Sequence, residues 1–102
     1  MKKTFYENSE QLLKNIIFST IKPEDKIQVF LFGSRASNTA RSRSDIDIAL
    51  FAQKPLPIGL LSQLKEKIEE STIPYQVDLV DLATTSPEFR QKVISRGKLW
   101  TV

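Results

Sequence analysis

The chain has 102 residues, with a hydrophobic fraction of 40% and a charged fraction of 26%, values that are ordinary for a globular domain. It contains no cysteine and no histidine, which excludes disulfide frameworks, thiolate or imidazole metal sites, and catalysis by a histidine base. Any chemistry must therefore rest on carboxylates, hydroxyls, Lys and Arg side chains, and a hard metal ion. The net charge of +3 suits a phosphate-bearing ligand or an acidic partner, although an ordinary surplus of surface lysine explains it equally well.

The length of the chain also bounds its organisation. We expect residues 1–102 to form one domain, because a chain of this length buries a single hydrophobic core. Residues 4–9 do not form the continuous apolar core of a signal peptide, and no apolar run approaches membrane-spanning length. These features predict a cytoplasmic protein that does not bind membranes.

The first two elements have clear boundaries in the sequence. Thr4 and Glu7 fit a capping box, and apolar residues then recur at helical spacing. The pattern predicts a helix over residues 5–21 that ends before Pro23, because the residue before a proline avoids the helical conformation. Residues 27–32 are β-branched and aromatic, which predicts a mostly buried strand.

A polar loop separates that strand from the next. Residues 35–44 are polar and rich in small side chains, so we expect a loop with one helical turn after Ser34. Residues 45–51 alternate between two faces. The alternation predicts a strand that places Asp45 and Asp47 on one face and its isoleucines on the other.

The second half of the chain continues the pattern. It predicts an amphipathic helix over residues 58–71, a strand over residues 75–82, and a last edge strand over residues 99–102. Between the last two, a helix begins after Ser86 and ends at Gly97, which we expect to adopt a left-handed conformation. This order predicts an α/β fold of the α+β kind, in which a small mixed sheet has helices packed on one face.

Two aspartates on one strand suggest a metal site. The backbones of Asp45 and Asp47 are expected roughly 6–7 Å apart, with both carboxylates on the same face. Two unpaired carboxylates this close repel each other, and a divalent cation between them removes the penalty. Mg²⁺ suits such ligands, and a second ion would support in-line phosphoryl transfer.

The residues before the aspartates suit a phosphate group. Gly33 allows the backbone to approach a ligand closely, and the Ser34 hydroxyl and nearby amides can bind phosphate oxygens. Three arginines in the following loop can neutralise a triphosphate; they are Arg35, Arg41 and Arg43. Each feature alone is more often a turn, a solvated strand end or a surface loop, but their combination favours a functional site.

The spacing of these residues has a known counterpart. Gly33-Ser34, ten further residues and then Asp45-Ile46-Asp47 resemble the signature of the DNA polymerase beta nucleotidyltransferase superfamily. The sequences on either side are most similar to its minimal nucleotidyltransferase (MNT) domains. The resemblance covers nearly the whole chain and implies a polymerase-beta-like nucleotidyltransferase fold.

The resemblance also implies roles for individual residues. Gly33 and Ser34, with Arg35 and Arg43, would bind the triphosphate of ATP, while Asp45 and Asp47 would bind Mg²⁺. A third acid on the neighbouring strand would complete the metal site and help to deprotonate the attacking hydroxyl. We expect that acid to be Asp78, which shares its strand face only with Val80; Asp81, at the strand end, is the alternative.

MNT domains of this size imply a protein partner. They pair with HEPN-domain ribonuclease toxins and act as antitoxins, in studied cases by transferring AMP from ATP to a tyrosine of the toxin. Two alternatives remain open: a catalytically weak, nucleotide-binding antitoxin that neutralises by complex formation, and the catalytic subunit of a small-molecule nucleotidyltransferase. Direct binding of nucleic acid is not expected, because the basic residues are dispersed along the chain.

Overall fold

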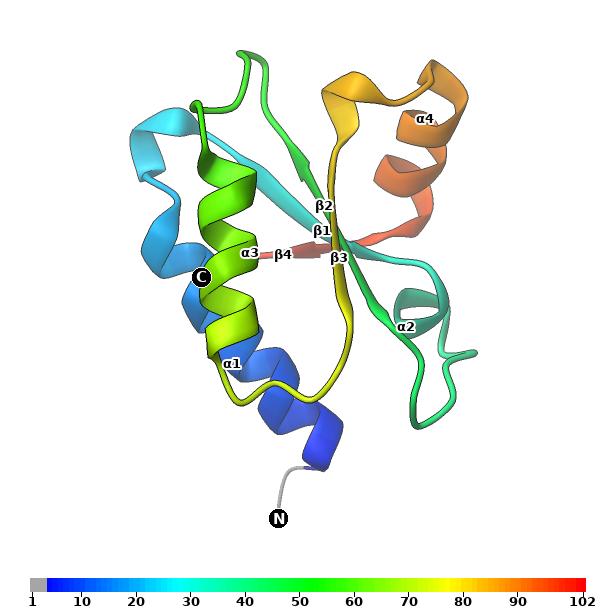
Figure 1. Ribbon diagram of the computed structural model, residues 1–102. Helices are drawn as coiled ribbons and strands as arrows, with labels where there is room; N and C mark the ends of the chain where they lie inside the picture. The colour runs from blue at the N-terminus through cyan, green and yellow to red at the C-terminus, as the bar shows by residue number, and fades with distance from the viewer. Residues whose placement is uncertain (1–3) are drawn as a thin grey trace.

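The computed structural model describes residues 4–102 and contains one four-stranded sheet with helices on both sides (Figure 1). Residues 1–3 of the predicted domain lie outside the described part. In chain order the elements are α1 Phe5–Thr20, the 3₁₀ turn η1 Pro23–Asp25, β1 Gln28–Phe32, α2 Ser34–Ser37, β2 Ile46–Phe51, α3 Leu60–Glu70, β3 Val77–Asp81, the 3₁₀ turn η2 Leu82–Thr84, α4 Pro87–Arg96 and β4 Lys98–Trp100. The predicted order of helices and strands is confirmed.

The sheet is mixed, with the strand order β3-β2-β1-β4. β1 runs antiparallel to both β2 and β4, whereas β2 and β3 are parallel and are joined by a crossover through α3. The register places Phe32 opposite Asp47 and places Asp47 opposite Asp78. The end of β1, the start of β2 and the start of β3 therefore lie side by side at one end of the sheet.

The larger core lies between the sheet and the helices α1 and α3, which share one face (Figure 1). Leu13 and Ile17 of α1 pack with Leu64 of α3 against the side chains of β2. The β2 residues in this core are fully buried: Ile46, Ile48 and Leu50. Burying each such side chain contributes about 1.5–3 kcal/mol, so this alternation fixes which face of β2 the aspartates occupy.

Helix α4 packs on the opposite face of the sheet, which corrects the expectation that the helices share one face. The structure confirms a shared face for α1 and α3 alone. A second apolar cluster joins Phe30 and Ala49 of the sheet to Leu82 and to Val93 of α4. The physical reason is that side chains alternate between the two faces along β1. Phe30 projects away from the first core, so another element must bury it. The cover extends over only part of this face and leaves Asp78 exposed.

The helix ends agree with the sequence except at Gly97. The capping box of Thr4 and Glu7 is present, and the Ser86 hydroxyl accepts from the amide of Phe89. Gly97 has φ −73° and not the predicted left-handed conformation. A glycine is needed there because a Cβ would lie 2.6 Å from the Val93 carbonyl oxygen and 3.0 Å from that of Leu31. Gly97 therefore lets the end of α4 pack directly on β1.

Within residues 4–102, no helix is both long enough and apolar enough to cross a membrane.

Candidate active site

Two aspartates from neighbouring strands lie side by side at this end of the sheet. Asp47 on β2 lies opposite Asp78 on β3, and Asp45 precedes β2 directly. Partial burial raises the pKa of Asp47 above its ordinary value of 3.8, and the charges of Asp78 and Asp45, with a hydrogen bond to Asp78, raise it further. Asp45 and Asp78 are exposed to solvent, so the three groups form an acidic cluster that is open on one side.

Gly33 lies directly against this cluster. Its φ of +73° belongs to the left-handed region, which strains any residue with a side chain. A Cβ on Gly33 would also overlap the Oδ2 atom of Asp47. The glycine therefore satisfies two constraints, because it allows the turn out of β1 and leaves space for the Asp47 carboxylate.

The helical turn predicted after Ser34 is present as α2. The amides of Ala36 and Ser37 both donate to the Gly33 carbonyl, at 3.1 and 3.2 Å, and Asn38 ends the turn in the left-handed conformation. The Ser34 side chain is half-buried at the start of α2, next to the glycine. The Gly-Ser pair is thus held in a fixed turn beside Asp47.

Arg35 points away from the acids. Its Nη2 atom donates to the carbonyl of Ser44 at 2.8 Å and to that of Ser42 at 3.4 Å. Its guanidinium lies over the rings of Tyr6 and Tyr75, at 4.2 and 4.9 Å from their centroids. Both tyrosines pack on the α1 side of the sheet, so the structure does not bring Arg35 to the Asp47 side, where a phosphate-binding role was predicted.

The other two arginines remain in the loop between α2 and β2. Arg41 and Arg43 are both exposed. The amide of Arg41 donates to the Ser44 hydroxyl at 2.8 Å, which closes a short turn just before Asp45. Arg43 lies within this turn, two residues before Asp45.

The alternative third acid occupies a different place. Asp81 pairs in register with Leu50, three residues further along the sheet than the pairing of Asp47 with Asp78. Its Oδ1 atom accepts from the amide of Ala83 at 3.0 Å and caps η2. The structure therefore places Asp78 beside Asp47 and leaves Asp81 in a capping position.

The cluster is not a closed metal cage. Among residues 4–102, no three acidic side chains converge closely enough to hold one ion by themselves. Asp45 and Asp47 lie two residues apart at the start of β2. They could share a divalent cation whose remaining ligands are water or substrate oxygens. A site of three carboxylates, with Asp78 as the third, stays a prediction.

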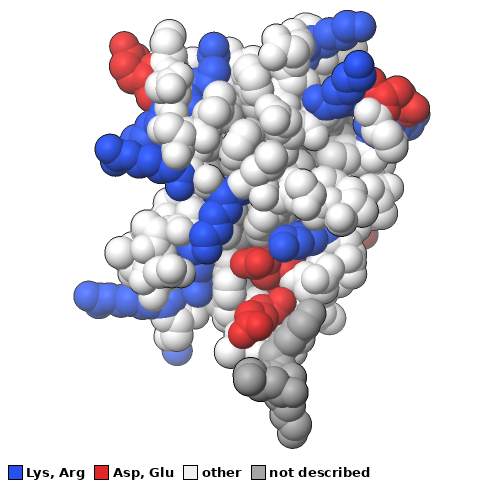
Figure 2. Space-filling view, turned by 180° about the vertical axis from the view of Figure 1, so that it is seen from behind, with Lys and Arg blue, Asp and Glu red and all other residues white. Residues whose placement is uncertain are grey.

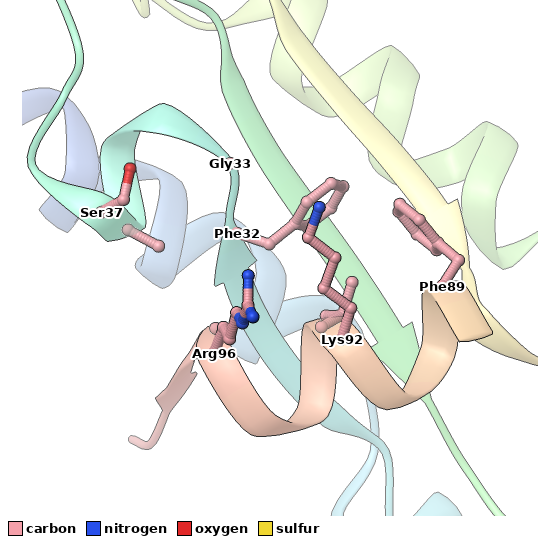
Figure 3. Close-up of a pocket in the computed structure, with 9 residues that line it drawn as sticks. Phe32, Gly33, Ser37, Phe89, Lys92 and Arg96 are labelled. Atoms are coloured by element: carbon pink, nitrogen blue, oxygen red, sulfur yellow. The ribbon is translucent and has the colours of Figure 1, made fainter. Parts of the chain in front are cut away.

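A cavity of about 410 Å³ adjoins the Gly33 turn, between α2 and α4 (Figure 3). Phe32 and Phe89 line it with their rings edge to face, 5.6 Å apart. Lys92 and Arg96 of α4 reach into it from the other side. The sequence analysis did not single out these two cations. Their sequence pattern is a weak indication of a binding site, because two basic residues four positions apart on a helix usually mark a solvated face.

Comparison with known proteins agrees with this architecture. The family model described as "Polymerase beta, Nucleotidyltransferase" matches residues 7–101. The chain belongs to the polymerase beta nucleotidyltransferase family. Its resemblance to that family, stated above from the spacing of the Gly-Ser and Asp-x-Asp residues, is confirmed.

The curated relatives are protein adenylyltransferases. The chain is 44% identical over 63 residues to the probable protein adenylyltransferase MntA of Haemophilus influenzae, a stretch that covers 62% of the chain and 55% of the relative. It is 37% identical over 94 residues to the protein adenylyltransferase MntA of Shewanella oneidensis, covering 89% of the chain and 67% of the relative. The chain thus spans little more than half the length of the first of these proteins.

Solved structures of toxin–antitoxin complexes share the fold. A toxin–antitoxin structure with AMP-PNP matches with a TM-score of 0.68 at 33% identity, over 93% of this chain and 74% of the other. A structure of tri-AMPylated Shewanella oneidensis HEPN toxin in complex with MNT antitoxin matches with a TM-score of 0.58 at 33% identity, over 90% and 72% of the two chains. The polymerase-beta-like fold is therefore confirmed.

The raised pKa of Asp47 gives a prediction for metal-free protein. A carboxyl whose pKa is higher in the folded state stabilises the fold while protonated, and that stability is lost as pH rises through the raised pKa. We expect Asp47→Asn, which cannot ionise, to be more stable relative to wild type at about pH 7 than at about pH 4. Urea unfolding in a chelator checks this, with Glu66→Gln on the exposed face of α3 as control. A pH-independent difference between Asp47→Asn and wild type would contradict the assignment.

Proposed function

We propose that the chain is a Mg²⁺-dependent nucleotidyltransferase that transfers AMP from ATP to a hydroxyl, a tyrosine, of a HEPN ribonuclease toxin, and so acts as an antitoxin. The observation that carries the proposal is the contact of Gly33 with Asp47, next to Asp78 on the neighbouring strand. The turn that we propose to bind phosphate thus lies beside a pair of acids, which supports a shared site. The relatives named protein adenylyltransferase and the complex with an AMPylated HEPN toxin support the choice of reaction and partner.

Asp45 and Asp47 are the residues that we propose to hold Mg²⁺, with Asp78 as the third acid of the metal site. Their carboxylates suit a hard cation. Burial, and then the charges of Asp78 and Asp45, raise the pKa of Asp47, and a bound cation would favour its charged form. When bound, Mg²⁺ would supply charge neutralisation for the phosphate oxygens of ATP. Because the acids alone do not enclose an ion, substrate oxygens complete the set of ligands.

Other residues of the chain bind the phosphates and accept the hydroxyl proton. Gly33 and Ser34 hold the phosphates at the turn, and Arg43 adds a cation from the exposed loop. The acceptor hydroxyl oxygen bonds to the α-phosphorus while the bond from that phosphorus to the bridging oxygen breaks, and pyrophosphate leaves. Asp78 is placed to accept the hydroxyl proton. We propose that residues 1–102 act as one such nucleotidyltransferase unit, in the cytoplasm.

Arg35 receives a positioning role in this proposal. Through the carbonyl of Ser44 it holds the residue that precedes Asp45, and its guanidinium lies over the rings of Tyr6 and Tyr75. A planar fork that bonds two carbonyls and stacks on rings is specific to arginine. The residue thereby sets where β2 begins, and with it the first carboxylate.

The transfer reaction itself is the first test. Purified chain, Mg²⁺, a HEPN-domain acceptor and ATP labelled at the α-phosphate should give labelled acceptor, whereas label at the γ-phosphate should not be transferred. Asp45→Asn and Asp47→Asn should each abolish the transfer because each removes a charge from the metal site, while Glu66→Gln should leave it unchanged. Retained transfer with both aspartates replaced would refute the mechanism. A tight complex without label would favour a binding antitoxin, and label on a small acceptor would favour a small-molecule nucleotidyltransferase.

The two candidate third acids give separable outcomes. Asp78→Asn should lower kcat by about 10²–10⁴-fold, the range for loss of a proton acceptor. Asp81→Ala should lower stability by about 0.5–2 kcal/mol through the lost cap, with kcat nearly unchanged. Single-turnover transfer and urea unfolding measure the two effects. Full activity in Asp78→Asn would mean that the acceptor proton leaves by another route.

The two arginines can also be told apart. Arg35→Lys keeps the charge but loses the fork, so we expect a higher Mg²⁺ concentration for half-maximal transfer, with the KM for ATP at saturating Mg²⁺ little changed. Arg43→Ala should raise the KM for ATP, because it removes a phosphate contact. Titrations of Mg²⁺ and ATP on the two variants measure this. An Arg35→Lys variant with only an increased KM for ATP would restore the phosphate-binding role.

A further inference from the structure

The cavity between α2 and α4 begins at the proposed catalytic site. Gly33 forms part of its wall, and a Cβ on the same glycine would overlap the Asp47 carboxylate. Ser37 lies on the wall of α2, and Figure 3 shows Lys92 and Arg96 across from it on α4. A group that leaves the acidic cluster past Gly33 therefore enters a space of about 410 Å³.

The charge in this cavity has one sign. Lys92 and Arg96 are its charged lining residues, and both are exposed on successive turns of α4. In residues 4–102 the one ion pair within 4 Å joins Lys14 to Glu10, so neither cation is neutralised by a carboxylate. Figure 2 shows Lys and Arg side chains gathered along the edge of the molecule where α2 and α4 lie. The cavity is therefore suited to an anion.

Helix α4 holds the two cations in a fixed position. The Ser86 cap begins the helix, Val93 is buried in the second core, and Gly97 allows the last turn to lie against the Leu31 carbonyl. The rings of Phe32 and Phe89 form an apolar floor, which lowers the local dielectric constant and strengthens the attraction between a cation and an anion. The backbone of the two basic residues is thus held on a packed helix, beside an apolar surface.

From these observations we infer that the cavity binds the β- and γ-phosphates of the nucleoside triphosphate, and that Lys92 and Arg96 hold this tail and then the pyrophosphate that leaves. The inference rests on the proposed function, because the α-phosphate must lie at the acidic cluster. The tail is a better occupant than the nucleobase. Phe32 and Phe89 pair edge to face with each other and present no parallel faces for a base, and Ser37 is the one lining residue with a neutral polar side chain.

The role concerns charge alone and requires no proton transfer. When the bond between the α-phosphorus and the bridging oxygen breaks, its electron pair stays on the oxygen of pyrophosphate, where negative charge increases. An ammonium and a guanidinium next to that oxygen stabilise it more strongly as the bond breaks. Lys92 and Arg96 are thus phosphate-binding residues that also favour departure of the leaving group.

Equilibrium binding separates this inference from the proposed function. We would measure the affinity of the full chain with Mg²⁺ for AMP and for an ATP analogue with an uncleavable α–β linkage. Lys92→Ala and Arg96→Ala should each weaken binding of the analogue by roughly tenfold, the value of one charge-assisted hydrogen bond. Binding of AMP, which lacks the tail, should change little. Lys92→Arg and Arg96→Lys should retain most of the affinity, and Lys54→Ala, an exposed lysine in the loop before α3, is the matched control.

Three other outcomes of the binding experiment would overturn the inference. Wild type that binds no ATP analogue would overturn both the proposed function and this inference. Tight binding by wild type and equally tight binding by the double Ala variant would overturn the inference alone. An equal loss of affinity for AMP and the ATP analogue would place the base or ribose in the cavity, which also overturns it. Thermal unfolding of each variant would show that the exposed substitutions leave the fold intact.

Discussion

The site depends on the contact between the backbone of Gly33 and the carboxylate of Asp47. β1 and β2 are antiparallel neighbours, so the end of β1 must pass the start of β2 at the distance of a strand pair. At that point a side chain on one strand would occupy the space of the acid on the other. Glycine resolves the conflict and also allows the positive φ that turns the chain into α2. The Gly33 turn and the Asp47 carboxylate can therefore lie together at one end of the sheet.

The core on the opposite face of the sheet determines which way the aspartates at this end of the strands point. Ile46 and Ile48 are fully buried against α1 and α3, so Asp47 between them must face the other way. The parallel pairing of β2 with β3 then brings Asp78 alongside. This arrangement opposes stability, because partial burial and then the two neighbouring carboxylates raise the pKa of Asp47 and disfavour its charged form. Buried apolar side chains on one face thus support an unfavourable charge cluster on the other.

Much of this could be predicted from the sequence, because local patterns determine it. The alternation of residues 45–51 gave the face of the acids, and the Gly-Ser pair gave the turn. Asp78 and Asp81 could not be separated with certainty, since strand register and a side-chain cap are set by tertiary contacts. Long-range packing also explains the position of α4, the extended conformation of Gly97 and the stacking of Arg35 on two tyrosines. Lys92 and Arg96 had no local signature, because only the packing of α4 beside α2 brings them to one cavity.

The most direct measurement of the central claim is a crystal structure with Mn²⁺ and a non-hydrolysable ATP analogue, using the anomalous signal of the metal. We expect the metal within ligand distance of Asp45 and Asp47, and the α-phosphate next to Gly33 and Ser34. A metal or nucleotide bound elsewhere, for example beside Asp81 at the other end of β3, would contradict the account, because the contact between Gly33 and Asp47 would then not define the site.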